Sequence, residues 1–318
     1  MNSLLRRFLM VEWSGILAAI ILGSALLAWL SPAFLTEFNI YVMLRSFCVA
    51  LLVGFAQMVT LAVGQMNISV GALGGLVAVL AGGMMEKLGV PMILAIPAAI
   101  AIGALCGLLN GVLTERTGIN GFIITLATAS AFTGINLGIT QSIPFYNMPP
   151  GLVAFGSDRF FAFPYLMIAP IIATVLLGLF LSRTVPGRHL LAVGGNPHAA
   201  ELSGISRGRI TILAHTLSGT LAACAAILAV AQLGSAQPTI GSDWLLLSFA
   251  APIIGGAALT GGHVSVLGTT LAVILIALIE NGMVLAKVDP YWVQFVLGAL
   301  ILAAVWLNRW RAVKTGTD

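Results

Sequence analysis

The sequence predicts an all-α, polytopic membrane protein. Three observations support this: the composition, the spacing of the charged residues and the side on which positive charges gather. Of 318 residues, 14 are Lys or Arg and 10 are Asp or Glu, whereas 59% are hydrophobic. Charged residues make up roughly 25% of a soluble globular chain but only 8% of this one. The composition excludes a cytosolic enzyme, a nucleic-acid-binding domain and a disordered chain.

Long uncharged stretches separate the charged residues, and crossing a bilayer takes about 20 apolar residues in a helix. We therefore expect one transmembrane domain over residues 1–318 with about ten helical spans. The expected spans are 13–31, 41–63, 70–86, 92–114, 119–140, 164–182, 211–235, 244–260, 264–286 and 290–308. The third and eighth are short enough to be broken or re-entrant helices.

An even number of spans places both termini on the same side of the membrane. With the N-terminus in the cytoplasm, ten positive charges fall on inner segments: Arg6, Arg7, Arg116, Arg183, Arg188, Arg207, Arg209, Arg309, Arg311 and Lys314. Four fall on outer segments: Arg45, Lys87, Arg159 and Lys287. Cytoplasmic segments carry the excess of Lys and Arg, so we expect an N-in, C-in orientation.

Residues 183–210 form the one large cytoplasmic loop of this topology. Within it, Asn196 is a good N-cap, Pro197 fits the first helical position, and Gly204 fits the position just after a helix end. The enclosed helix has under two turns and is marginal by itself in water. Two interpretations stay open: an ordinary connecting loop, or a helix that docks into a groove of a cytoplasmic protein.

The sequence lacks the residue patterns of catalysis and of metal binding. No G-x4-G-K-[ST] motif is present to hold ATP phosphates. The four histidines, His189, His198, His215 and His263, fit no zinc spacing, and the three cysteines, Cys48, Cys106 and Cys224, all fall inside spans. We expect no catalytic residue, metal or cofactor in this chain.

Polar side chains within the membrane, inside the spans or around the break at 64–70 between the second and third spans, are the candidates for a solute pathway, because uncompensated polar groups in hydrocarbon are expensive. The pathway candidates are Gln57, Asn67, Ser69, Asn110 and Asn136; Gln65, Thr125, Thr128, Gln232 and the pair Glu280–Asn281 share the same property. For any one amide, a hydrogen bond between helices is favoured over contact with a solute; it is the group as a whole that indicates a polar pathway. Glu280 is the only acidic residue even partly inside a span, so coupling to an ion gradient has little support.

Small residues allow close helix packing in lipid, and the sequence supplies four Gly-x3-Gly pairs. They are Gly71–Gly75, Gly103–Gly107, Gly107–Gly111 and Gly134–Gly138. We interpret these pairs as helix contacts rather than as functional sites.

Several motifs together resemble one family. Residues 64–71 read GQMNISVG, where the family usually has G-x-I-D-L-S-V-G. Leu109-Asn-Gly111, the segment 192–205 with Asn196, and the glycine-rich stretch 255–262 follow in the family's order, and Glu280-Asn-Gly282 ends the series. The sequence resembles the permease subunit of bacterial ABC importers for ribose, arabinose, galactose and related sugars.

This resemblance implies a bacterial inner-membrane permease of about ten helices for a monosaccharide or similar small polar solute. It implies a dimer with a second copy or a paralogue. It also implies a separate cytoplasmic ATPase that holds ATP and Mg, and a periplasmic or lipoprotein solute-binding protein. Lipid would surround the chain, and no nucleic acid is involved. Asn67, where the family usually has Asp, and Asp243, in a segment that is often G-x-G-x-E-L, depart from the pattern.

By the same resemblance, the helix after Asn196 looks like the coupling helix that contacts the ATPase. The expected contacts are Asn196, Pro197, His198, Ala200, Glu201 and Ser203. Four alternatives were weighed against this interpretation: a passive channel, a secondary carrier, an ABC permease for branched-chain amino acids, and a membrane scaffold that transports nothing. The first two would act without a partner ATPase.

Overall fold

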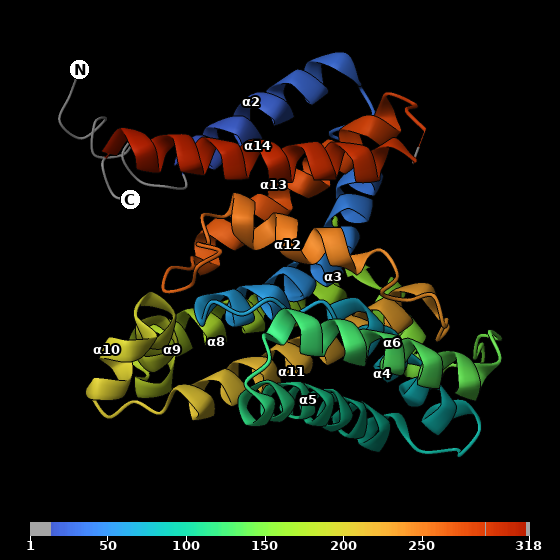
Figure 1. Cartoon of the computed structure of the whole chain (residues 1–318). Helices are drawn as coiled ribbons and strands as arrows, with labels where there is room; N and C mark the ends of the chain where they lie inside the picture. Colours follow the sequence, from blue (N-terminus) through green and yellow to red (C-terminus); the bar gives the residue numbers. More distant parts are fainter. Residues whose placement is uncertain (1–13, 290, 316–318) are drawn as a thin grey trace.

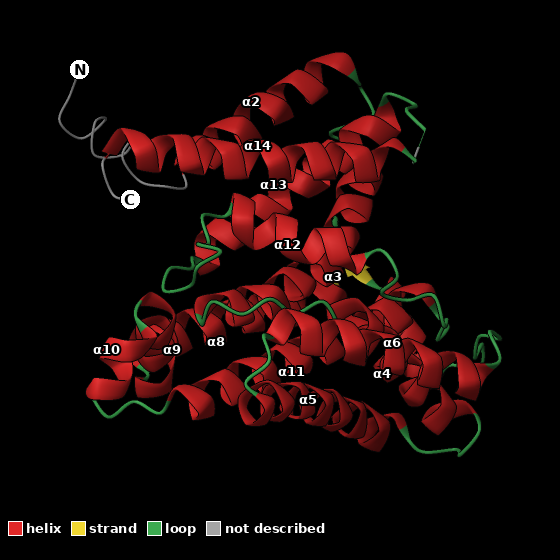
Figure 2. Ribbon diagram, in the orientation of Figure 1, coloured by secondary structure: helices red, strands yellow, loops and turns green. Residues whose placement is uncertain are grey.

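The computed structural model describes residues 14–289 and 291–315. Over these residues the chain is helical, apart from one short two-stranded hairpin (Figures 1 and 2). Arg6 and Arg7, two of the charges behind the expected orientation, lie outside the described residues, as do residues 13 and 290, where the first and last expected spans begin.

Each expected span contains a helix, and further helices lie between them. In chain order the helices are α2 (Ser14–Leu30), α3 (Glu37–Ala62), α4 (Val70–Glu86), α5 (Met92–Thr117), α6 (Gly121–Thr140), α7 (Pro150–Ser157), α8 (Ile168–Arg183), α9 (Val185–Gly195), α10 (Pro197–Leu202), α11 (Arg207–Leu233), α12 (Trp244–Ile254), α13 (Val266–Leu285) and α14 (Trp292–Thr315). The hairpin pairs β1 (Arg159–Phe160) with β2 (Phe163–Pro164), and a 3-10 turn (Tyr165–Met167) leads into α8.

Six of the described helices are long and apolar enough to cross a membrane: α3, α5, α6, α8 with its preceding turn, α11 and α13. This makes the chain a multi-pass helical membrane protein. α2, α4 and α12 are shorter apolar helices. The expected span 244–260 is wrong in its extent, because α12 ends at Ile254 and Gly256, with φ +92°, turns the chain away.

Sequence analysis missed three elements. The loop expected at 183–210 contains α9 as well as α10, because Thr184 caps α9 by accepting the N–H of Gly187 at 3.1 Å. The outer loop between α6 and α8 contains α7 and the β1–β2 hairpin. These elements lack the long apolar runs on which the span assignment depended.

α3 and α11 form the centre of the molecule. Figure 1 shows α2, α13 and α14 on one side of α3, and α5, α8 and α11 on the other. α11 packs closely on α5, because Gly103 and Gly107 face Gly219 and the backbone of His215 with no room for a Cβ. The expected packing role of this Gly-x3-Gly series is confirmed. Gly134 and Gly138, by contrast, face open space.

The bundle has two distinct ends. In Figure 1, α9 and α10 lie at one end, together with the start of α2 and the end of α14. The loop after α4, the loop after α6 and the segment between α11 and α12 lie at the other end. We call these the α10 end and the opposite end.

Candidate functional site

α10 has the capping chemistry that the sequence predicts. The side chain of Asn196 accepts the N–H of Ala199 at 2.9 Å, and Pro197 takes the first helical position. At the other terminus Gly204 has φ +81° and donates its N–H to the carbonyl of Glu201 at 2.9 Å. Capping at both termini lets so short a helix hold its shape.

Most of the expected ATPase contacts lie on the surface. Those that are exposed are Asn196, Pro197, His198, Glu201 and Ser203. Ala200 is different: it is 5% exposed and packs against the rest of the chain. Leu202, which sequence analysis did not select, is 79% exposed. Its place between the polar residues Glu201 and Ser203 is the sequence signal that could have identified Leu202 as a contact residue.

A contact made almost entirely of backbone connects α9 and α10 to the centre of the molecule. A Cβ on Gly194 would overlap the carbonyl oxygen of Ala62, the last residue of α3. The N–H of Gly262 donates to that same carbonyl at 3.0 Å. Gly261 has φ +94°, and a Cβ there would lie 2.6 Å from the nitrogen of Gly64. We call these five residues the glycine junction; it joins the end of α9, two residues before the N-cap of α10, to the end of α3.

Four of the five expected pathway residues form one buried hydrogen-bonded network. Asn67 donates to Ser218 on α11 at 2.9 Å and accepts the hydroxyl of Ser69 at 2.7 Å. Asn110 on α5 donates to Ser69 at 2.8 Å. With its amide oriented to suit its neighbours, Gln57 donates to the carbonyl of Asn67 at 2.8 Å. These four residues and Ser218 are at most 1% exposed.

This network holds the break between α3 and α4, where the backbone cannot satisfy its own polar groups. Two further contacts tie the break to the start of α6. Gln65 accepts the N–H of Gly121 at 3.0 Å, and Thr125 accepts the N–H of Ile68 at 3.0 Å. In this conformation the break is joined to α5, α6 and α11 at once.

Asn136, the fifth expected pathway residue, lies apart from this network. Its side-chain NH2 donates to the carbonyl of Pro238 at 2.9 Å. It lines a cavity of about 260 Å³ together with Thr133 of α6 and Ser242. Both Pro238 and Ser242 belong to the segment 235–243 between α11 and α12.

Sequence analysis treated the segment 235–243 as a short outer loop and so missed its polar residues. Gln237, Thr239, Ser242 and Asp243 line a further cavity of about 440 Å³. The departure of Asp243 from the family pattern was the one sequence signal that pointed to this segment.

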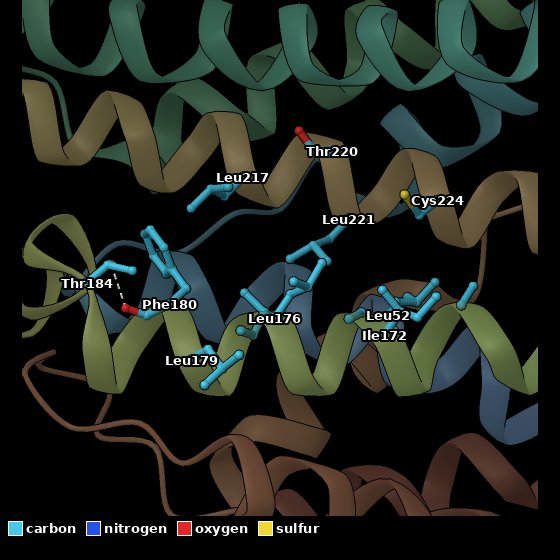
Figure 3. Close-up of a pocket in the computed structure, with 13 residues that line it drawn as sticks. Leu52, Ile172, Leu176, Leu179, Phe180, Thr184, Leu217, Thr220, Leu221 and Cys224 are labelled. Carbon is cyan, nitrogen blue, oxygen red and sulfur yellow. Dashed lines mark hydrogen bonds between the residues drawn. The ribbon is translucent and has the colours of Figure 1, made fainter.

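A third cavity has a different character (Figure 3). It has a volume of about 650 Å³ and lies between α8 and α11, with Leu52 of α3 behind it. Its walls are almost wholly apolar: Ile172 and Leu176 line it from α8, and Leu221 lines it from α11. At one end Thr184 uses its hydroxyl to donate to the carbonyl of Phe180 at 2.7 Å, so this hydroxyl is already satisfied.

Comparison with known proteins identifies the family. A family model described as "Branched-chain amino acid transport system / permease component" matches residues 33–305. The chain belongs to this permease family. A ribose import permease protein of Bacillus subtilis is 35% identical to it, over 88% of this chain and 87% of the relative.

Other relatives of the permease are named for a different solute, autoinducer 2. Autoinducer 2 import system permease proteins are 31% identical in Photorhabdus laumondii, over 94% of this chain and 96% of the relative. In Yersinia pseudotuberculosis the identity is 32%, over 92% of this chain and 90% of the relative. No solved structure gives a significant match. The family and the apolar helices together make this chain a multi-pass inner-membrane permease subunit of an ABC importer.

Proposed function

We propose that this permease carries a monosaccharide or a similar small polar solute into the cytoplasm, driven by ATP hydrolysis on a separate subunit that holds ATP and Mg. The relatives reported above are named for ribose and autoinducer 2, which favours such a solute over a branched-chain amino acid. Membership of an ABC permease family favours this role over that of a passive channel or a secondary carrier.

One observation carries the proposal: α10 is short, capped and exposed, and the glycine junction fixes the end of α9, which leads directly into α10, to α3. A helix held by backbone contacts transmits a displacement with little loss, because no flexible side chain lies between the moving parts. We propose that the ATPase grips α10 through Glu201 and Leu202. Ala200 would hold α10 to the permease rather than contact the partner.

The same proposal links the ATPase to the membrane interior. A push on α10 passes through Gly194 to Ala62, and then to the break that Asn67 anchors. ATP binding can shift the permease between outward-open and inward-open states only through a difference in affinity for the two. α10 is where the partner would apply that difference. Gln57, Asn67, Ser69 and Asn110 would then serve the pathway by setting the position of the break.

We propose about ten membrane crossings with both termini in the cytoplasm. The start of α2 and the end of α14 lie at the α10 end in Figure 1, as this topology requires. A second copy or a paralogue would pack against α6. There Gly134 and Gly138 have no atom within 4 Å of the place a Cβ would take, and small residues let helices approach closely. A periplasmic or lipoprotein binding protein would deliver solute to the opposite end.

The test is reconstitution in liposomes of the permease with the ATPase and the binding protein that purify with it. ATP-driven accumulation of labelled D-ribose, L-arabinose or D-galactose is expected only when all components are present. Glu201→Arg is expected to lower the uptake per ATP hydrolysed about tenfold or more, because like charges across an interface repel strongly, without loss of membrane expression.

Asp158→Arg is the matched control, since it makes the same charge reversal at an exposed acidic residue outside α9 and α10. Unchanged coupling in the Glu201 variant would remove that residue from the contact. Sustained uphill accumulation by the permease alone would refute the proposed function.

A further inference from the structure

The segment 235–243 returns along α4 instead of crossing the surface. Ala236 lies against Gly82, near the C-terminal end of α4, and Gly241 lies against Gly71, near its N-terminal end. These two glycines are three helical turns apart, about 16 Å at 1.5 Å per residue. α12 therefore begins beside the N-terminal end of α4, with Trp244 buried and Ser242 and Asp243 exposed.

Three contacts hold this segment in place. Ala236 pairs with Phe145 in an isolated bridge, with N–H to O distances of 2.8 and 3.1 Å. Asn136 holds the carbonyl of Pro238. Gly241, with φ +88°, meets the backbone of Gly71 so closely that neither residue has room for a Cβ. The segment is a fixed wall rather than a loose loop.

The cavity of about 440 Å³ lies on one side of this wall, a volume within the range of small-molecule sites. α3 and α11 supply its other walls. Its polar lining consists of one carboxylate, two amides and three hydroxyls: Asp243, Gln232, Gln237, Ser46, Thr239 and Ser242.

The charges of this lining select among solutes. Asp243 contributes a carboxylate, and among the described residues no lysine, arginine or histidine lines the cavity. The carboxylate precedes α12 but makes no capping hydrogen bond, so its oxygens are available as acceptors. A carboxylate accepts two hydroxyl donors side by side, and amides and hydroxyls both donate and accept. A neutral molecule with several hydroxyl groups matches this set.

An amino acid matches it poorly, because its carboxylate would need a cation. Arg45 is next to Ser46 in sequence but is not part of the cavity lining; one guanidinium nitrogen is engaged by backbone, and its buried Nε has no hydrogen-bond partner among the described residues. The guanidinium donates to the carbonyl of Gln232 at 2.6 Å and lies 5.5 Å from the ring centre of Tyr41. The cavity wall thus offers an acid and neutral groups, but no positive partner.

We propose that this cavity is a binding site for a neutral polyhydroxylated solute, held by its hydroxyls on Asp243, Gln237 and Gln232. This inference rests on the proposed function and adds the place and the recognising groups. Ser242 lines both this cavity and the 260 Å³ cavity. The segment 235–243 then separates two chambers of the solute's route.

The experiment measures uptake against sugar concentration in the full reconstituted importer, with D-ribose, L-arabinose, D-galactose and L-leucine as probes. Asp243→Asn keeps the shape of the side chain and removes its charge. It is expected to raise the half-saturating concentration of the transported sugar at least about tenfold, since hydrogen bonds to a charged group are the strong ones. Asp289→Asn, an acid near the same end that does not line the cavity, is expected to behave as the unmodified chain.

A second readout is independent of transport rate. In a chain whose Cys48, Cys106 and Cys224 are replaced by alanine, Ser242→Cys is expected to react with a hydrophilic maleimide. The transported sugar should slow that reaction several-fold, and L-leucine should not.

The outcomes separate the two claims. An unchanged half-saturating sugar concentration in Asp243→Asn, or a maleimide reaction of Ser242→Cys that sugar does not slow, overturns this site. Sugar uptake would still support the proposed function in either case. If L-leucine, and none of the sugars, slows the labelling of Ser242→Cys or is taken up, the assignment of a neutral solute is overturned. Absence of ATP-driven uptake of every sugar probe refutes the proposed function, and this inference falls with it.

Discussion

The cavity of about 650 Å³ between α8 and α11, which we call the apolar groove, shares two of its walls with the cavity of about 440 Å³, which we call the polar cavity. The two differ completely in chemistry. α3 contributes Leu52 to the groove and Ser46 to the polar cavity. α11 contributes Leu221 to the groove and Gln232 to the polar cavity. The third wall differs most: α8 closes the groove mainly with aliphatic side chains, whereas the segment 235–243 closes the polar cavity with one amide, two hydroxyls and a carboxylate.

This contrast teaches that size is a poor guide to the solute site in a membrane protein. The larger space, at about 650 Å³, has walls as apolar as a lipid chain and offers a hydroxylated solute almost no hydrogen bond. The smaller space supplies donors and acceptors that would be expensive to bury unsatisfied. Polar groups that are left without protein partners mark where a polar molecule or water belongs.

The largest effect is expected from adding a side chain at the contact between Gly71 and Gly241, which holds the segment 235–243 in place. Gly71→Val would push a side chain into the backbone of Gly241, and backbone cannot move aside as a side chain can. We expect a loss of about 3 kcal/mol or more of stability, at the upper end of overpacking effects. Thermal unfolding in nanodiscs measures it.

Gly178→Val is the matched control on the groove side, because Gly178 of α8 has no atom within 4 Å of its missing Cβ. We expect the unfolding temperature of that variant to stay within a degree or two. Equal destabilisation by both variants would show that the segment 235–243 is no more tightly fixed than a lipid-facing helix surface.

An intermediate effect is expected from placing a charge in each space. Leu176→Asp puts a carboxylate in the middle of the apolar wall, at a cost of about 2.5 kcal/mol on insertion scales. Thr239→Asp puts the same charge in the polar wall, where water and hydroxyls can solvate it. The amount of folded protein in the membrane should fall sharply for the first and little for the second. A similar fall in both would mean that the two spaces are equally dry.

Sequence reasoning succeeded where the signal was local. The caps of α10 could be predicted because Asn196, Pro197 and Gly204 each act on backbone within a few residues. The packing of Gly103 and Gly107 followed from their spacing on one helix face. Such effects depend on neighbours in the chain, so the sequence alone is sufficient for them.

It failed where the outcome depends on distant partners. The residues 235–243 include Gly241 and Pro238, which are typical of a surface turn. That they run inward depends on Gly71 and Gly82, more than 150 residues away. Likewise, the sequence indicates that Asn67 is a polar residue within the membrane. It does not indicate that Ser218 accepts a hydrogen bond from it.

The smallest effect is expected from removing one hydrogen bond of the polar wall. Asn136→Ala deletes the donor to the carbonyl of Pro238, which lies 2.9 Å from it. A single such bond contributes about 0.5–1.5 kcal/mol, so the fold should persist while the segment 235–243 opens more often. Hydrogen exchange should rise several-fold at the amide of Ala236, and sugar uptake should fall by about half.

Thr133→Ala is the control for this variant, since Thr133 lines the same 260 Å³ cavity from the preceding turn of α6. Exchange at Ala236 should not change when Thr133 is replaced. If Asn136→Ala also leaves it unchanged, the Phe145–Ala236 bridge and the close contact of Gly71 with Gly241 hold the segment without the side chain of Asn136. The polar cavity would then owe its shape to backbone packing, and its side chains would be left free to select the solute.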